Sequence, residues 1–299
     1  MDKTYIAVGE RIRENAELVE TALEQYFDYT DADYGEVIEA QKYSLLGGGK
    51  RIRPFLANEV CRTLGGTIEA SMPLACAVEM IHTYSLIHDD LPCMDDDDMR
   101  RGKPSNHKVY GYAGALLAGD ALLTRAFGVI AGAETLSAEQ KASAVLTLAN
   151  AAGDCGMIGG QVIDLDGENK ELSFDKLLRL HAHKTGALIR CAAVLGCIAA
   201  GFAPDTAEAK AIATYADKIG LAFQVVDDIL DATASEEELG KTVGSDADNN
   251  KTTFLTFYSV EEAAAYAARL TDEAIESVSG IAKSDVLCGL AYELLHRKN

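Results

Sequence analysis

Residues 82–101 read HTYSLIHDDLPCMDDDDMRR, an apolar helical pattern that runs into six aspartates and then two arginines. The aspartates are Asp89, Asp90 and Asp95–Asp98. Carboxylates beside an apolar helix are unfavourable unless a positive group balances them. An acidic run is more often a solvated loop, so Asp96–Asp98 alone would indicate only exposed charge.

A second acidic cluster, Asp227-Asp228-Ile-Leu-Asp231, lies far downstream in another apolar segment. Asp227 and Asp231 are four residues apart, so they share one helical face, where like charges destabilise a helix that lacks a counter-ion. Mg²⁺ takes oxygen ligands and is usually completed by substrate phosphates. The two clusters therefore predict a magnesium-diphosphate site held between two helices.

Composition narrows the possible functions. A net charge of −20 argues against nucleic acid and against an anionic membrane surface as partners. The longest apolar run, Cys191–Ala203, is shorter than the roughly 20 residues that span a bilayer, so no stable membrane insertion is expected. The first residues show no secretory signal pattern, and the seven cysteines form no CxxC pair, which favours a reduced, cytoplasmic protein.

Helical signals dominate the chain. The sequence has only five prolines and no sustained period-two alternation, which predicts an all-α fold of about a dozen helices. No linker divides the chain, so residues 1–299 are expected to form a single domain. Helices are predicted over 5–28, 73–89 and 175–200, with two more in 259–296. Residues 113–133 form an apolar segment, and a polar loop is predicted over 232–250.

Two basic stretches accompany the acidic clusters. Residues Leu45–Pro54 place three glycines before Lys50, Arg51 and Arg53, a pattern that lets backbone N–H groups and cations approach an anion. Arg100–Pro104 forms a turn that carries three more cations. Each stretch is a candidate diphosphate clamp, and a loop of solvated cations is the alternative for both.

Geometry relates some of these residues along the helix. His82 and Asp89 are seven apart and project to the same side, although a lone helical histidine is often a core residue. Asp95 would lie about 120° from Asp89 on an ideal helix. The stretch Leu91–Met94, with a helix-breaking proline, must therefore bend to bring the two carboxylates together.

A polar interruption divides the segment 175–200. Lys184 and Thr185 precede a glycine, which predicts a local kink that presents a pair of donors; a packing point for a neighbouring helix is the alternative. His181 and His183 are two residues apart and face different sides of a helix, which argues against a metal shared between them.

Together these motifs resemble the trans-isoprenyl diphosphate synthases, over nearly the whole chain and most closely in the manner of bacterial farnesyl diphosphate synthases. The motifs are His88–Asp96 with Arg100–Pro104, Phe223–Asp231, Gly48–Pro54, Gly160–Leu165 and Lys184–Gly186. The resemblance implies antiparallel helices around a deep central cavity, a homodimer, and head-to-tail 1′-4 condensation of isopentenyl diphosphate with an allylic diphosphate.

The resemblance also implies roles for individual residues. Three Mg²⁺ ions would be held by Asp89, Asp95, Asp227 and Asp231. The allylic diphosphate would be bound by Arg100, Lys184, Thr185, Gln224, Lys241 and Lys251, of which Lys184, Thr185 and Gln224 would flank the allylic cation. Isopentenyl diphosphate would be bound by Lys50, Arg53, His82 and Arg101. Product length would be set by Tyr84 and Ser85, which precede the first aspartate.

An aromatic residue at Tyr84 favours farnesyl diphosphate as the product, and a geranylgeranyl diphosphate synthase is the nearest alternative. A terpene cyclase would not need Lys50 and Arg53, and a non-catalytic subunit of a heteromeric synthase commonly lacks one acidic motif. One departure from the family pattern is Ser245, which replaces a lysine that many members carry, so one diphosphate contact is in doubt.

Overall fold

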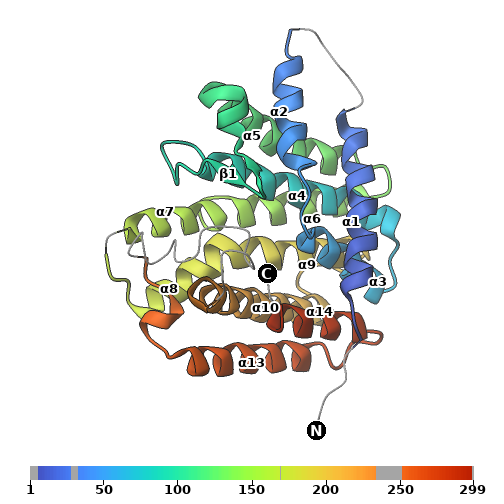
Figure 1. Ribbon diagram of the computed structural model, residues 1–299. Coiled ribbons are helices and arrows are strands. Elements are labelled where there is room, and N and C mark those ends of the chain that lie inside the picture. The colour runs from blue at the N-terminus through green and yellow to red at the C-terminus, as the bar shows by residue number, and fades with distance from the viewer. Residues whose placement is uncertain (1–5, 28–32, 169, 234–250, 298–299) are drawn as a thin grey trace.

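The computed structural model describes residues 6–27, 33–168, 170–233 and 251–297 (Figure 1). The α-helices are α1 (Gly9–Glu24), α2 (Gly35–Leu45), α3 (Ile52–Thr63), α4 (Ile68–Asp89), α5 (Asn106–Gly132), α6 (Ala138–Ala152), α7 (Met157–Gly167), α8 (Phe174–His181), α9 (Ala187–Ala199), α10 (Ala207–Thr233), α13 (Val260–Ser277) and α14 (Asp285–Leu295). Short turns of helix are η1 (Gln25–Phe27), η2 (Ala182–Gly186) and η3 (Phe254–Thr256), and β1 (Met99–Arg100) pairs with β2 (Lys103–Pro104). The predicted all-α fold is confirmed.

Helix α4 carries the first acidic cluster to the edge of the core. It packs against α3, α5 and α9, and side chains such as Met80 and Ile87 are buried along it. The side chain of Thr67 caps its start by accepting a hydrogen bond from the N–H of Ala70 at 3.3 Å. The helix therefore begins five residues before the predicted position 73, and its last residue is Asp89.

Helix α10 carries the second acidic cluster and packs against α13 and α9. Its central Tyr215 is fully buried and donates a hydrogen bond from its hydroxyl to the carbonyl of Leu287 at 2.6 Å. This contact joins α10 to α14. The two helices predicted within 259–296 are present as α13 and α14. The carboxyl-terminal turns of α10 then present Asp227 next to η2.

The predicted kink near Lys184 is present as η2, a π-helical turn between α8 and α9. Such turns insert one extra residue and occur often at functional sites. Gly160 of α7 lies directly against this turn, because a Cβ there would stand 2.2 Å from the backbone nitrogen of Lys184. The glycine therefore allows α7 to approach the kink closely.

One predicted boundary differs from the structure: the amino-terminal helix, predicted over 5–28, begins at Gly9, and Ile6 precedes it and is exposed. The apolar segment 113–133 lies almost wholly within α5, which begins at Asn106 and is interrupted at Gly111, whose φ of 74° is left-handed. Of the predicted polar loop, residues 234–250 lie outside the described chain.

Length and hydropathy alone would allow two helical segments to cross a membrane. The segment Phe174–Ala199 is two-thirds buried and is explained as a core element. Helix α5 is different, because only 39% of its most apolar window is buried. This is weak evidence for a membrane span, and the absence of membrane insertion stays a prediction. Figure 1 shows α5 with α2 at one end of the molecule and α13 at the other.

Candidate active site

The chain bends sharply after α4, as the spacing of the first acidic cluster predicts. The N–H of Asp95 donates a hydrogen bond to the carbonyl of Asp89 at 2.8 Å, and the N–H of Asp96 donates to the carbonyl of Leu91 at 3.2 Å. These bonds fold the Leu91–Met94 segment back on the helix end. The backbone of Asp95 is thereby held beside Asp89.

Asp89 lies in an environment that disfavours its charged form. Burial is the main cause that raises the pKa of Asp89 to about 6; the positive charge of Lys184 opposes this rise, and the negative charge of Asp95 adds to it. A carboxylate that is disfavoured in its charged form beside a second acidic residue favours a bound cation. Their all-oxygen donor set fits Mg²⁺.

A chain of hydrogen bonds reaches the second acidic cluster. The hydroxyl of Thr185 donates to Oε1 of Gln224 at 3.1 Å, and Nε2 of Gln224 donates to Oδ2 of Asp227 at 3.1 Å. The buried Asp228 accepts a bond from the N–H of Phe254 at 2.7 Å, which assigns it to the scaffold. Asp231 follows one turn after Asp227 and is buried.

A polar cavity of about 210 Å³ lies against this second cluster and is lined by residues of η2, α10 and the segment 251–253. Within it, Nζ of Lys184 lies 2.6 Å from Oδ2 of Asp164, and Nζ of Lys251 lies 3.6 Å from the same oxygen. Burial alone would raise the pKa of Asp164, but these two cations hold it below its usual value. Lys184 lines this cavity together with Asp227, and its charge also acts on the pKa of Asp89, so it lies near both acidic clusters.

Two arginines assigned to isopentenyl diphosphate, Arg53 and Arg101, lie near His82, which has the same assignment. Burial, followed by the positive charges of Arg53 and Arg101, holds the pKa of His82 well below its usual range. Arg101 donates a hydrogen bond to the carbonyl of Gly48. Gly49, at φ 127°, has room only for a hydrogen, because a Cβ would stand 3.0 Å from the Arg101 guanidinium carbon.

Two arginines are already engaged within the protein. Arg51 takes a left-handed φ of 51°, is buried, and forms an ion pair with Glu79 at 2.6 Å, so it is part of the scaffold. Arg100 forms an ion pair with the buried Asp90 and another with Asp97 at 3.2 Å. These pairs hold Arg100 on the loop that also carries the first acidic cluster.

Arg297 is a site residue that sequence reasoning missed. Its Nη2 donates to Oδ1 of Asp227 at 2.5 Å and to the carbonyl of Phe223 at 3.1 Å, and its guanidinium lies 3.7 Å from the centroid of the Phe223 ring. Partial burial of its ammonium group, followed by the charge of Arg297, lowers the pKa of Lys50. The charge of Asp227 acts in the opposite direction. Lys50 therefore reaches the same region as the second acidic cluster.

The residues assigned to product length lie on α4 next to the first cluster. Tyr84 is 5% exposed, its ring meets the ring of His88 edge-on at 5.7 Å, and its buried hydroxyl has no hydrogen-bond partner in the described chain. Burial, with Asp89 as a second cause, raises the pKa of Tyr84 to about 12. The hydroxyl of Ser85 donates to the carbonyl of His82 at 2.9 Å.

The two histidines near the kink diverge, as expected. His181 lines the polar cavity and stacks on Phe254 at 5.5 Å, and burial lowers the pKa of His181 to about 4. A ring nitrogen of His183 lies 3.1 Å from the carbonyl of Cys155, on another side. Lys241 and Ser245 lie outside the described residues.

Mg²⁺ affinity of the substrate-free protein is expected to fall as pH drops through about 6, because Asp89 becomes protonated there and a ligand carboxylate must be ionised. Asp95→Asn removes a negative charge that raises the pKa of Asp89, so the midpoint should move to lower pH. Calorimetric titration with Mg²⁺ across this range measures both. An affinity that does not change with pH would contradict the assignment of Asp89.

Comparison with known proteins places these features in a family. The profile described as "Polyprenyl synthetase" matches residues 35–288. The large subunit 1 of the chloroplastic heterodimeric geranylgeranyl pyrophosphate synthase of Arabidopsis thaliana is 46% identical over 292 residues, which cover 95% of this chain and 78% of the relative. The farnesyl diphosphate synthase of Geobacillus stearothermophilus is 45% identical over 251 residues, which cover 83% of this chain and 84% of the relative.

The structural likeness is equally extensive. The solved geranylgeranyl pyrophosphate synthetase from Pyrococcus horikoshii Ot3 superposes with a TM-score of 0.87 at 31% identity, covering 97% of this chain and 98% of that one. Since the sequence and structural matches both extend over most of the chain, the protein belongs to the polyprenyl synthetase family of trans-isoprenyl diphosphate synthases.

Proposed function

We propose that the protein is a (2E,6E)-farnesyl diphosphate synthase, which joins isopentenyl diphosphate head to tail (1′-4) to dimethylallyl and then to geranyl diphosphate. One observation carries the proposal: Lys184 lines a cavity with Asp227 of the second acidic cluster and acts on the pKa of Asp89 in the first, while a separate group of cations lies around His82. A region rich in carboxylates and a second region rich in cations suit two diphosphate substrates, one bound through metal ions and one bound directly. Prenyltransferase activity is also what the names of the relatives state for those proteins.

The family uses Mg²⁺, and the carboxylates of this chain fit that ion. Asp89 and Asp95 would hold it at the end of α4, and Asp227 with Asp231 at the end of α10, with three ions in total. Bound Mg²⁺ would neutralise the allylic diphosphate and so favour departure of that group. Burial raises the pKa of Asp89 despite the nearby charges of Lys184 and Arg100, and a bound cation would favour its ionised form.

The cations of the chain would stabilise the charge that develops on the leaving diphosphate. Lys184 and Lys251 converge on Asp164, which holds both ammonium groups at the cavity. Arg100, fixed by Asp90, would bind the same diphosphate from the first cluster, and Lys241 is assigned the same role by resemblance.

Oxygen atoms near the kink would stabilise the allylic cation. The hydroxyl of Thr185 and the amide oxygen of Gln224 meet at 3.1 Å within the polar cavity. The π-helical turn that contains Lys184 also alters the usual pairing of backbone carbonyls there. A partial negative charge at these oxygens lowers the energy of a nearby carbocation.

The second substrate would be held by Lys50, Arg53, His82 and Arg101. His82, whose pKa is held well below its usual range, stays neutral and acts as a hydrogen-bond donor or acceptor, so the guanidinium groups supply the charge. The double bond of isopentenyl diphosphate would attack the allylic cation. The released diphosphate would then remove the proton, so no protein base is required.

A geranylgeranyl diphosphate synthase is the second candidate, because several relatives carry that name. One assay separates the candidates: the purified chain is incubated with isopentenyl and dimethylallyl diphosphates and Mg²⁺, and the products are resolved by chromatography. We expect a linear C15 product. A linear C20 product would support the second candidate, a cyclic hydrocarbon would indicate a terpene cyclase, and no product would indicate a subunit that needs a partner.

Tyr84→Ala is expected to give products longer than C15. Tyr84 is a large buried side chain five residues before Asp89, so its removal opens space along α4 where a growing chain would lie. Chromatography of the products measures the change, with Tyr292→Ala on α14 as a control at an exposed tyrosine. An unchanged C15 product would remove Tyr84 from the assignment of product length.

We also propose that a second copy of the chain covers the outer face of α5. Helix α5 is strongly apolar yet mostly unburied, and Leu117 is 56% exposed on it, beside Tyr112 and Leu116. A hollow of about 1150 Å³ lies between this face and α2. Contiguous exposed apolar surface often marks a protein interface.

Leu117→Arg is expected to convert a dimer into a monomer, because a charge would be buried in the interface. Sedimentation velocity measures the mass, with Leu18→Arg on α1, an equally exposed leucine, as the control. A wild-type chain that sediments as a monomer at every concentration would refute self-association. A different subunit would then be the partner. The Arabidopsis relative is named as the large subunit of a heterodimer.

A reducing compartment such as the cytoplasm is proposed as the location. All seven cysteines are free, and four of them are buried as small core side chains.

A further inference from the structure

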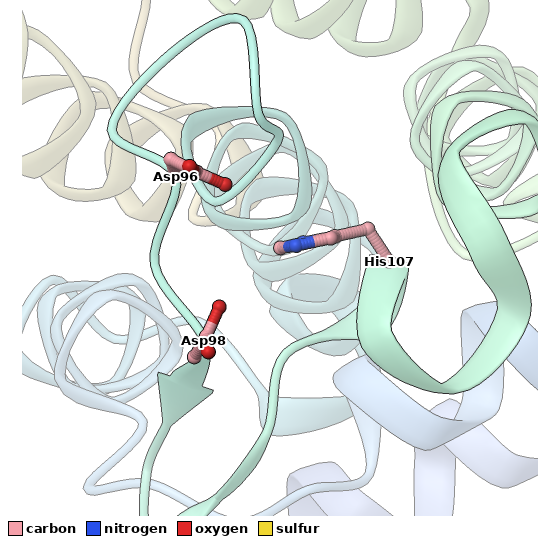
Figure 2. A group of neighbouring side chains, drawn as sticks. All are labelled: Asp96, Asp98 and His107. Carbon is pink, nitrogen blue, oxygen red and sulfur yellow. The ribbon is translucent and has the colours of Figure 1, made fainter.

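A second group of potential metal ligands lies beside the active-site loop. Asp96 and Asp98 precede β1, and His107 is in the first turn of α5. One ligand atom from each of the three side chains lies within 4.8 Å of the others. Figure 2 shows the imidazole of His107 pointing toward the space between the two carboxylates.

His107 gives independent reason to expect a ligand there. The residue is 8% exposed, and its Nε2 is buried without a hydrogen-bond partner in the described chain. Its Nδ1 lies 3.1 Å from the hydroxyl of the buried Ser105. If Nδ1–H donates to that oxygen, Nε2 carries the free lone pair, which is how a second partner orients a metal-binding imidazole. An unsatisfied buried polar atom is otherwise costly.

We propose that Asp96, Asp98 and His107 bind a divalent transition-metal ion of the Mn²⁺ to Zn²⁺ class, at a site separate from the substrate-binding carboxylates. One imidazole nitrogen with two carboxylates suits these ions, whereas Mg²⁺ prefers an all-oxygen set. The site does not depend on the proposed product, because none of its three residues is assigned to a substrate.

The nearby Lys108 competes with such an ion. Its Nζ lies 2.7 Å from Oδ1 of Asp98, and both side chains are exposed. An exposed ion pair contributes little to stability, so a divalent ion with a nitrogen ligand can displace the ammonium group. Removing this lysine should therefore strengthen metal binding.

Occupancy would fix the geometry of the active-site loop. The same loop carries Asp95, immediately before Asp96, and Arg100, soon after Asp98. A metal bridge from the loop to His107 would connect it to α5 in addition to the bond from the N–H of Ser105 to the carbonyl of Asp98 at 2.9 Å. The ion would thus act as a positioning element for the first acidic cluster.

Mn²⁺ is the probe of choice, because the exposed Cys93 on the same loop would attract softer ions such as Zn²⁺. The full-length protein is titrated with Mn²⁺ in excess Mg²⁺, without substrate, and bound Mn²⁺ is examined by pulsed electron paramagnetic resonance for coupling to ¹⁴N. We expect nitrogen coupling in the wild type. His107→Gln should abolish it and weaken binding at least about tenfold.

Three further variants decide the result if His107→Gln alters the fold. Asp98→Asn changes an exposed side chain and should also weaken binding, Lys108→Met should strengthen it, and Asp97→Asn, a neighbour outside the group, should leave it unchanged. Wild-type Mn²⁺ without nitrogen coupling would overturn the proposal. Coupling that disappears in Asp89→Asn but persists in Asp98→Asn would overturn it as well.

Discussion

Asp89→Asn is expected to lower kcat/KM for the allylic substrate by at least about 10³-fold, because it removes a charged ligand at the point where negative charge must be stabilised. The protein itself should remain at least as stable near neutral pH. Burial raises the pKa of Asp89 to about 6, so the ionised carboxylate destabilises the folded state above that pH, and an uncharged amide relieves this cost.

Steady-state kinetics and a thermal unfolding curve of the same preparation separate the two effects. Asp175→Asn, a change of the same kind at an exposed position of α8, serves as the control and should leave both unchanged. A variant that loses less than about tenfold in kcat/KM would show that Asp89 does not hold the catalytic cation.

Lys184→Gln is expected to lower kcat by about 10²- to 10³-fold, since it removes a cation aimed at the leaving diphosphate. The loss of this positive charge should also raise the pKa of two nearby carboxyl groups. Asp164 would keep only Lys251 as its partner, so its pKa would rise, and the pKa of Asp89 would rise too because Lys184 opposes its upward shift. The acid limb of the pH–rate profile should therefore move to higher pH.

The pH shift distinguishes this role from a structural one. Lys210→Gln, at an exposed lysine of α10, is the matched control and should alter neither kcat nor the profile. If the Lys184→Gln enzyme loses activity while the acid limb of its pH–rate profile stays in place, the charge of Lys184 does not affect the pKa of Asp89.

Local sequence features predicted the parts of the molecule that depend on neighbouring residues. The bend at Leu91–Met94 follows from a proline and from the need to join Asp89 with Asp95, and the backbone bond between those two confirms it. The kink at Lys184 follows from polar residues and a glycine inside an apolar helix. The local pattern specifies neither its π-helical form nor the close approach of Gly160 from α7.

Contacts between residues far apart in the sequence determine which charged side chains lie at the site, and local patterns do not specify those contacts. Arg51 and Arg53 stand two residues apart in one basic stretch, yet Arg51 turns inward because Glu79, 28 positions away, is its partner. Arg297 contacts Asp227 across 70 positions, and no local pattern marks either residue for the other. His107 reaches Asp98 only because β1 and β2 pair in the register of Met99 with Pro104.

If both acidic clusters bind one diphosphate group through Mg²⁺, changes in the two clusters should be coupled, and a double-mutant cycle measures that coupling. Calorimetry measures the affinity of inorganic diphosphate with and without Mg²⁺ for the wild type, Asp89→Asn, Asp227→Asn and the double variant. Binding is expected to require Mg²⁺ and to be largely abolished by each single change, with little further loss in the double variant. Binding that is independent of Mg²⁺, or losses that simply add, would contradict a shared site.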